Sequence, residues 1–228
     1  MTDDDLEKSE QLYNTINDFR SDKDRNTIFE KHYGDIDTNI GVKEYSNEET
    51  NGSYDLKTNT IFMARKKMPY LNDGFTNIKN NIPLNENQTL AIKDYGHEGV
   101  HTKQKNLDKI EYASAIERRL LEALTEMKAR NIAINYLEEA TKKTRGNPNF
   151  RDFINKSETY QNVIKGIDDF CKEYKIRNKS QIINEFIEKT YKDDFDPNNS
   201  IKTLMETINN TRNDKIKEET LKEFLRRV

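Results

Sequence analysis

A five-residue segment has the residue types and the spacing of a zinc site. The segment is His97-Glu98-Gly99-Val100-His101, an H-E-x-x-H pattern that uses two of the three histidines in the 228-residue chain. Residues four apart lie on the same face of a helix, so His97 and His101 can each offer an imidazole nitrogen to one ion. Glu98 lies about 100° around the helix, where its carboxylate takes a proton from a water molecule that the metal activates. The pattern predicts Zn²⁺ as cofactor, two histidine ligands and Glu98 as catalytic base.

A catalytic zinc site needs a third protein ligand, and the sequence offers two kinds of candidate. His32 is the remaining histidine, but nothing in its segment directs it toward the first pair. Glu122 and Glu126 lie four residues apart on a second helix, whose start is indicated by Ser114 with Glu117 three residues later. The alternative for both glutamates is a solvated position on the surface of that helix.

At these residues the chain resembles the gluzincins, the thermolysin-like zinc peptidases, in which a glutamate ligand follows H-E-x-x-H by about twenty residues within an E-x-x-x-D pattern. Glu122 follows His101 by 21 positions, and Glu126 stands where the family has Asp. The resemblance implies that Glu122 binds zinc and that Glu126 accepts a hydrogen bond from a ligating histidine. The longer side chain at 126 departs from the family pattern. Residues 54–130 are also similar to uncharacterised bacterial metallopeptidase domains.

The elements that must position these residues follow from periodicity. Helical spacing of apolar residues indicates helices at 6–20, 25–33, 87–105 and 114–140, and again at 153–174, 180–191 and 201–225, the last with a break near Asn209. Residues 66–86 contain Pro69, Gly74 and Pro83 among many Asn and are predicted to form a long surface connection. Residues 41–46 and 52–64 carry β-branched and aromatic residues between turn signals, which predicts two or three short antiparallel strands.

One of these strands is a candidate for substrate binding. In the peptidases that the chain resembles, a strand beside the active helix pairs with the extended substrate, because an edge strand offers free N–H and C=O groups. The natural candidate has the residues Thr60, Ile61, Phe62, Met63 and Ala64. Its alternative is an ordinary core strand. The oxyanion that develops during hydrolysis also needs a donor, and since no histidine follows His101, Tyr112 or another tyrosine would serve.

The predicted fold is α+β and mostly helical, with a small antiparallel sheet packed on a zincin-type active-site helix and a C-terminal helical region. Gly146-Asn147-Pro148 is the best boundary. It separates a zincin-like metallopeptidase domain, residues 1–147, from a helical subdomain, residues 148–228. Residues 150–228 are the candidate region for binding a protein partner.

Composition excludes several other classes of function. The 38 basic and 41 acidic residues are interspersed and give a net charge of −3, so no basic stripe indicates nucleic acid. No run approaches the roughly 18 apolar residues of a membrane span. Cys171 is the single cysteine, so neither an intrachain disulfide nor a cysteine metal cluster is expected. The first residues lack the pattern of a secretory signal, which favours the cytoplasm or export without a classical signal peptide.

These observations predict an enzyme that hydrolyses peptide bonds in a peptide or protein substrate, with zinc as cofactor and Glu98 as general base. The alternative is a non-catalytic helical interaction protein in which the HEGVH segment is inert or holds zinc structurally. Glu98 distinguishes the two, because a structural zinc site has no use for a carboxylate at that position.

Overall fold

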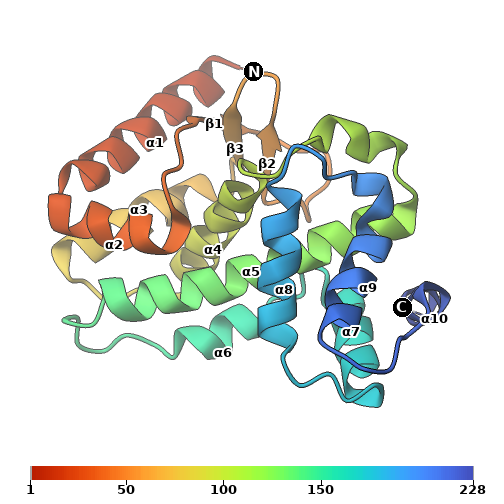
Figure 1. Cartoon of the computed structure of the whole chain (residues 1–228). Helices are drawn as coiled ribbons and strands as arrows, with labels where there is room; N and C mark the ends of the chain where they lie inside the picture. The colour runs from red at the N-terminus through yellow and green to blue at the C-terminus, as the bar shows by residue number, and fades with distance from the viewer. Residues whose placement is uncertain (1, 228) are drawn as a thin grey trace. The chain divides into compact units, whose positions relative to one another are not determined.

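The computed structural model describes residues 2–227, and it confirms an α+β fold that is mostly helical (Figure 1). The α-helices are α1 Asp3–Ser21, α2 Lys23–Tyr33, α3 Met68–Asn80, α4 Glu86–His101, α5 Ala115–Ala140, α6 Phe150–Asn155, α7 Gln161–Glu173, α8 Lys179–Thr190, α9 Ser200–Asn210 and α10 Glu218–Arg226. Two short 3-10 helices and three strands complete it: η1 Leu107–Tyr112, η2 Pro197–Asn199, β1 Asn39–Lys43, β2 Gly52–Asp55 and β3 Thr60–Ala64. Among the helices of this described part, none has both the length and the apolar character needed to cross a bilayer.

The chain divides into two compact units, and neither is continuous in sequence. Unit 1 comprises Met1–Thr102 and Ala129–Ser157, and unit 2 comprises Lys103–Lys128 and Glu158–Val228. The division differs from the predicted boundary after residue 147, because the 26-residue helix α5 contributes its first half to unit 2 and its second half to unit 1. Turn residues mark the ends of helices, but they do not reveal that one long helix belongs to two units.

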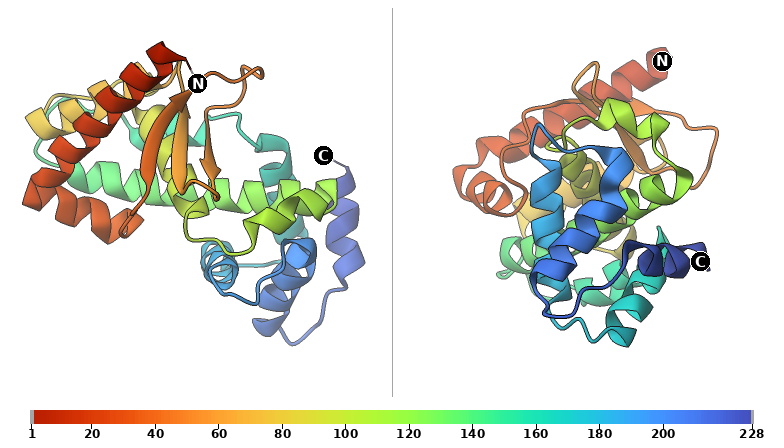
Figure 2. Two further views of the ribbon diagram at one scale, coloured as in Figure 1. Left: turned by 90° about the horizontal axis from the view of Figure 1, so that it is seen from above. Right: turned by 45° about the vertical axis from the view of Figure 1, so that its right-hand side comes forward.

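The sheet of unit 1 has the strand order β1-β3-β2, with β3 in the centre (Figure 2). β3 pairs in parallel with β1, where Ile40 lies opposite Ile61, and antiparallel with β2, where Tyr54 lies opposite Ile61. The sheet is therefore mixed, and the prediction of a purely antiparallel sheet is wrong. The connection 44–51 carries the chain past the position of β3, so strands that are consecutive in sequence are not neighbours in space.

The prediction that Thr60–Ala64 is an edge strand is also wrong. Both sides of β3 are hydrogen-bonded to neighbouring strands, so its N–H and C=O groups are not available to a substrate. The reason is its apolar character: Ile61 and Met63 are fully buried and belong to the core of unit 1. A strand that is buried in this way takes the centre of a small sheet, and β1 and β2 are left as the edges.

Helix α1 packs against β1, and its first turn is fixed by a polar cluster. Thr2 caps the helix: its hydroxyl accepts a hydrogen bond from the Asp5 backbone N–H, and the Asp5 carboxylate accepts one from the Thr2 backbone N–H. The Arg65 guanidinium, which follows β3, donates to the same carboxylate at 2.6 Å. The Thr2 backbone hydrogen bond and the Arg65 guanidinium lower the pKa of Asp5 to about 2.

Residues 66–86 are not a surface connection, because they contain α3. Pro69 lies in the first helical turn, where the missing N–H costs nothing, and Asn81 ends the helix in the left-handed conformation at φ 54°. Gly74 lies where α3 meets α4, since a methyl group there would be 3.0 Å from Cδ1 of Ile92. The residues that suggested a loop thus have places in the helix: Pro69 lies in its first turn, Gly74 lies at a close helix contact, and Asn81 caps its end. The buried side chains recur at helical spacing: Met68, Leu71, Phe75 and Ile78.

Unit 2 contains the predicted C-terminal helices from α7 onward, whereas α6 belongs to unit 1. The predicted segment 153–174 is broken by a turn into α6 and α7. The segment 201–225 forms α9 and α10, and the end of α9 at Asn210 agrees with the break predicted near Asn209. Within this unit α8 packs on α9, and α10 packs on α7 and α9; Figure 2 shows α8 and α9 side by side. The Ser114 hydroxyl accepts from the Glu117 backbone N–H, which confirms the predicted start of α5. The Glu117 carboxylate accepts from the backbone N–H of Ile201 at 2.7 Å, near the start of α9.

Candidate metal centre

The H-E-x-x-H segment forms the last turns of helix α4. The helix starts with a capping box, in which the Asn85 side chain accepts from the Gln88 backbone N–H and the Gln88 side chain accepts from the Asn85 backbone N–H. Every residue from Ala91 to His101 is buried. Since polar residues are rarely buried all around a helix, the histidines and the glutamate at its end need a specific reason for their burial.

His97 and His101 face one another across one helical turn. Their Nε2 atoms are 3.1 Å apart, and each side chain is only 7% exposed. Two nitrogens bound to one tetrahedral zinc at the usual distances are about 3.3–3.4 Å apart. The imidazoles would therefore have to separate by only about 0.3 Å to hold the ion, which is within ordinary side-chain freedom.

Two glycines allow other parts of unit 1 to approach this helix closely. A methyl group at Gly96 would lie 2.3 Å from Cε1 of Tyr33, and one at Gly99 would lie 2.6 Å from Cδ1 of Ile36. Glycine lowers helix stability by about 1 kcal/mol relative to alanine. Its presence at position 99, inside the H-E-x-x-H segment, is explained by this contact.

Glu98 lies beside strand β2. A methyl group at Gly52 would be 3.0 Å from Cγ and 3.2 Å from Oε1 of Glu98, and also 3.2 Å from the backbone oxygen of Phe62. The Glu98 side chain is 7% exposed. An edge strand of the sheet thus runs directly past the carboxylate, and a methyl group at position 52 would require the Glu98 side chain to shift by a few tenths of an ångström.

Tyr45 is a further residue of this region that the sequence analysis did not select. It contacts β2, the strand that passes beside Glu98. Its hydroxyl is 2.6 Å from the Ser53 hydroxyl and donates to the backbone oxygen of Phe62 at 3.3 Å. Burial raises the pKa of Tyr45, the Ser53 hydrogen bond acts in the opposite direction, and the charge of Glu98 adds to the increase. The hydroxyl is therefore a neutral donor. No spacing relates it to the H-E-x-x-H segment, so only the fold reveals it.

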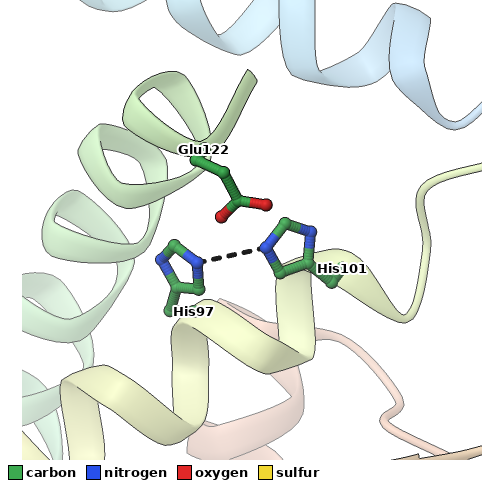
Figure 3. A group of neighbouring side chains, drawn as sticks. All are labelled: His97, His101 and Glu122. Carbon is green, nitrogen blue, oxygen red and sulfur yellow. Dashed lines mark hydrogen bonds between the residues drawn. The ribbon is translucent and has the colours of Figure 1, made fainter. Parts of the chain in front are cut away.

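Glu122 is the third member of the candidate metal-binding group. His97, His101 and Glu122 each offer one ligand atom, and these atoms lie within 4.8 Å of one another (Figure 3). Figure 3 shows the Glu122 carboxylate pointing toward the two imidazoles. The residues that the sequence proposed as ligands are the ones grouped here. One carboxylate oxygen of Glu122 also accepts a hydrogen bond from the Tyr160 hydroxyl at 3.2 Å.

Glu126 and His32, the other two candidates, differ in their surroundings. Glu126 is fully buried, so it does not occupy the solvated surface position that was its alternative. His32 lies in unit 1 with its Nε2 2.8 Å from Oε2 of Glu139. Hydrogen bonds from the Lys31 ammonium, which has the larger effect, and from the His32 imidazole lower the pKa of Glu139. His32 has a structural partner of its own and does not belong to the metal-binding group.

A buried ion-pair network holds α4 one turn before the histidines. The Lys93 ammonium is 2.6 Å from one carboxylate oxygen of Asp94, and the Lys67 ammonium is 3.1 Å from the other. Lys93 is 1% exposed, so its charge is balanced inside the protein. Because Lys67 is at the start of α3, the network joins the beginning of that helix to α4.

Tyr112, the tyrosine that the sequence named as a possible oxyanion donor, is 76% exposed at the end of η1. A hydrogen bond with Glu111 is the main cause that raises its pKa. The hydroxyl is thus engaged with a neighbouring residue at the surface of unit 2.

Comparisons with known proteins give no match: no family model, no curated protein and no solved structure is significantly similar to this chain. The geometry of the residues themselves is therefore the basis for any assignment of function.

Proposed function

We propose that the chain is a zinc-dependent peptidase with His97, His101 and Glu122 as metal ligands. The observation that carries the proposal is the pair of buried imidazoles 3.1 Å apart, with the buried Glu98 next to them in the same helix. The donor set of two nitrogens and one carboxylate oxygen is the one found in peptidases of the thermolysin type. The Glu122 oxygen, within 4.8 Å of the other ligand atoms, would approach by at most about 1.5 Å to reach bonding distance.

Zinc, when bound, would polarise the scissile carbonyl and make a water molecule more acidic. Glu98 takes the proton of the attacking water and later passes it to the leaving amine. The contact with β2 restricts the carboxylate on one side, because Gly52 lies against it. Its orientation is thus set by the sheet and not by solvent, which is what a general base requires.

Strand β2 replaces β3 as the proposed substrate-binding strand. Among residues 2–227 the sheet ends at β2 on this side, so its outer N–H and C=O groups are open to an extended peptide. The strand also passes directly beside Glu98. A peptide that pairs with Gly52–Asp55 would bring a backbone carbonyl close to the general base. Tyr45, whose hydroxyl contacts Ser53 of the same strand, replaces the exposed Tyr112 as the candidate hydroxyl donor.

The first test is metal content. The purified chain should contain about one zinc by elemental analysis after dialysis, and His97→Ala with His101→Ala should remove it. His32→Ala is the matched control, because this histidine contacts Glu139 and should leave the metal in place. Unchanged zinc in the double variant would contradict the proposed ligands.

The second test separates a peptidase from a zinc-binding scaffold. Glu98→Gln should retain zinc and fold, while cleavage of an unstructured peptide library, followed by mass spectrometry, falls at least about 100-fold. Glu86→Gln is the control on the same helix, since Glu86 is exposed in its first turn. Equal cleavage by parent and Glu98→Gln, or no cleavage by either, would favour the interaction protein.

A further inference from the structure

Tyr160 has a backbone conformation that is unusual for its residue type. Its φ is 55° and its ψ is 18°, in the left-handed region that favours glycine. The residue occupies the third position of a turn in which the Gln161 N–H donates to the Glu158 oxygen at 3.0 Å. Turns with positive φ at this position normally have glycine or asparagine there. An aromatic residue at this place costs free energy that a different residue would avoid.

Tyr160 differs from the other residues with a left-handed backbone, because neither its residue type nor its position explains the conformation. Within residues 2–227, the non-glycine residues with positive φ are Asn59, Asn81, Asn106, Tyr160 and Lys175. Asparagine tolerates this conformation because its short polar side chain bonds locally. Lys175 follows the end of α7, where a left-handed residue commonly terminates a helix. Tyr160 precedes the start of α7, where serine, threonine, aspartate or asparagine is usual.

The side chain of Tyr160 supplies a reason for this cost. Its hydroxyl donates to one carboxylate oxygen of Glu122 at 3.2 Å, and both residues belong to unit 2. Tyr160 is partly buried, so the hydrogen bond is shielded from water on one side. A hydroxyl on one oxygen restricts the rotation of the carboxylate and leaves the second oxygen for another partner.

We propose that Tyr160 is a positioning residue for the third zinc ligand: its hydroxyl holds the Glu122 carboxylate in the orientation that binds the metal. The proposal rests on the zinc site proposed above. Residues that hydrogen-bond to metal ligands typically change metal affinity about 10 to 100-fold when they are removed. The hydrogen bond to Glu122 is thus a functional reason for the unusual backbone conformation of Tyr160.

The test is zinc affinity in the full-length chain, measured by competition with a chromophoric chelator. Tyr160→Phe retains the ring and the backbone and removes only the hydroxyl, so zinc affinity should fall about 10 to 100-fold while the metal-free protein keeps its unfolding midpoint. Tyr160→Gly makes the backbone conformation ordinary and also removes the hydroxyl, so it should bind zinc no more tightly than Tyr160→Phe. Tyr191→Phe, at the end of α8 in the same unit, is the control and should bind zinc like the parent.

A spectroscopic readout distinguishes positioning from a general loss of structure. In the cobalt-substituted chain, the visible absorption bands should change in Tyr160→Phe and stay the same in Tyr191→Phe, because they report ligand geometry. If Glu122→Ala abolishes zinc binding and Tyr160→Phe binds zinc like the parent with unchanged cobalt bands, the metal centre stands and the role of Tyr160 is refuted. If the parent binds no zinc, or binds it equally well in Glu122→Ala, the ligand set fails and the role of Tyr160 fails with it.

Discussion

Replacing Gly99 with alanine tests how tightly residue 36 packs against the H-E-x-x-H helix. The new methyl carbon would lie 2.6 Å from Cδ1 of Ile36 and 3.6 Å from its Cγ1. Non-bonded carbons prefer about 3.5–4.0 Å, so the overlap of about 1 Å involves a single atom, Cδ1. Ile36→Val removes that atom and leaves the rest of the buried side chain in place.

The expected magnitudes follow from opposing effects. Alanine at 99 should stabilise the helix by about 1 kcal/mol, and the overlap with Ile36 should cost about 1–3 kcal/mol, which gives a net loss of about 0–2 kcal/mol. Ile36→Val alone should cost about 0.5–1.5 kcal/mol because it leaves a cavity. In the double variant the new methyl fills that cavity. Its free energy of unfolding should exceed the additive value by about 1–3 kcal/mol.

Urea denaturation of the four metal-free proteins, followed by circular dichroism, measures this coupling. Gly74→Ala combined with Ile36→Val is the control, because Gly74 meets Ile92 and not Ile36, so these effects should add within about 0.5 kcal/mol. Ile36 does not pack tightly against Gly99 if Gly99→Ala and Ile36→Val are additive within the same margin, or if Gly99→Ala alone stabilises the protein by about 1 kcal/mol.

Three further outcomes are expected. Gly52→Ala should retain zinc but reduce peptide cleavage at least about 10-fold, since the new methyl displaces Glu98; parent-like cleavage would show that the carboxylate has room to move. The pKa of Asp5, about 2, lies below its unfolded value near 3.9, so its ionised form stabilises the fold above about pH 4 and this contribution disappears as the pH falls toward 2. Asp5→Asn should flatten that part of a stability curve measured by urea titration, and an unchanged slope would contradict the role of the Arg65 contact. Removal of zinc by a chelator should lower the thermal midpoint, because zinc at a free concentration 100 times its Kd would stabilise the fold by about 2.7 kcal/mol; equal midpoints would argue against a site in the folded state.

The sequence alone located most of the helices and singled out the residues of the central motif. Helical periodicity located α1, α2, α4 and α5 and the helices after Gly146, because the 3.6-residue repeat is a property of neighbouring positions. The pairing of His97 with His101 is equally local, since both lie on one helix. Glu122 was selected by its spacing from that helix and by a family resemblance, and it is one of the three residues whose ligand atoms lie within 4.8 Å of one another.

Tertiary structure decided the order of the strands and the surroundings of the site. Thr60–Ala64 is the central strand although it is the last of the three in the chain, because this position buries Ile61 and Met63 in the core. α3 was missed because Pro69 and Gly74 are breakers in general but are harmless at a first turn and at a close helix contact. The contacts of Gly52 with Glu98 and of Tyr160 with Glu122 join residues 46 and 38 positions apart. No local pattern encodes such contacts, because they arise only when the sheet and the helices pack together.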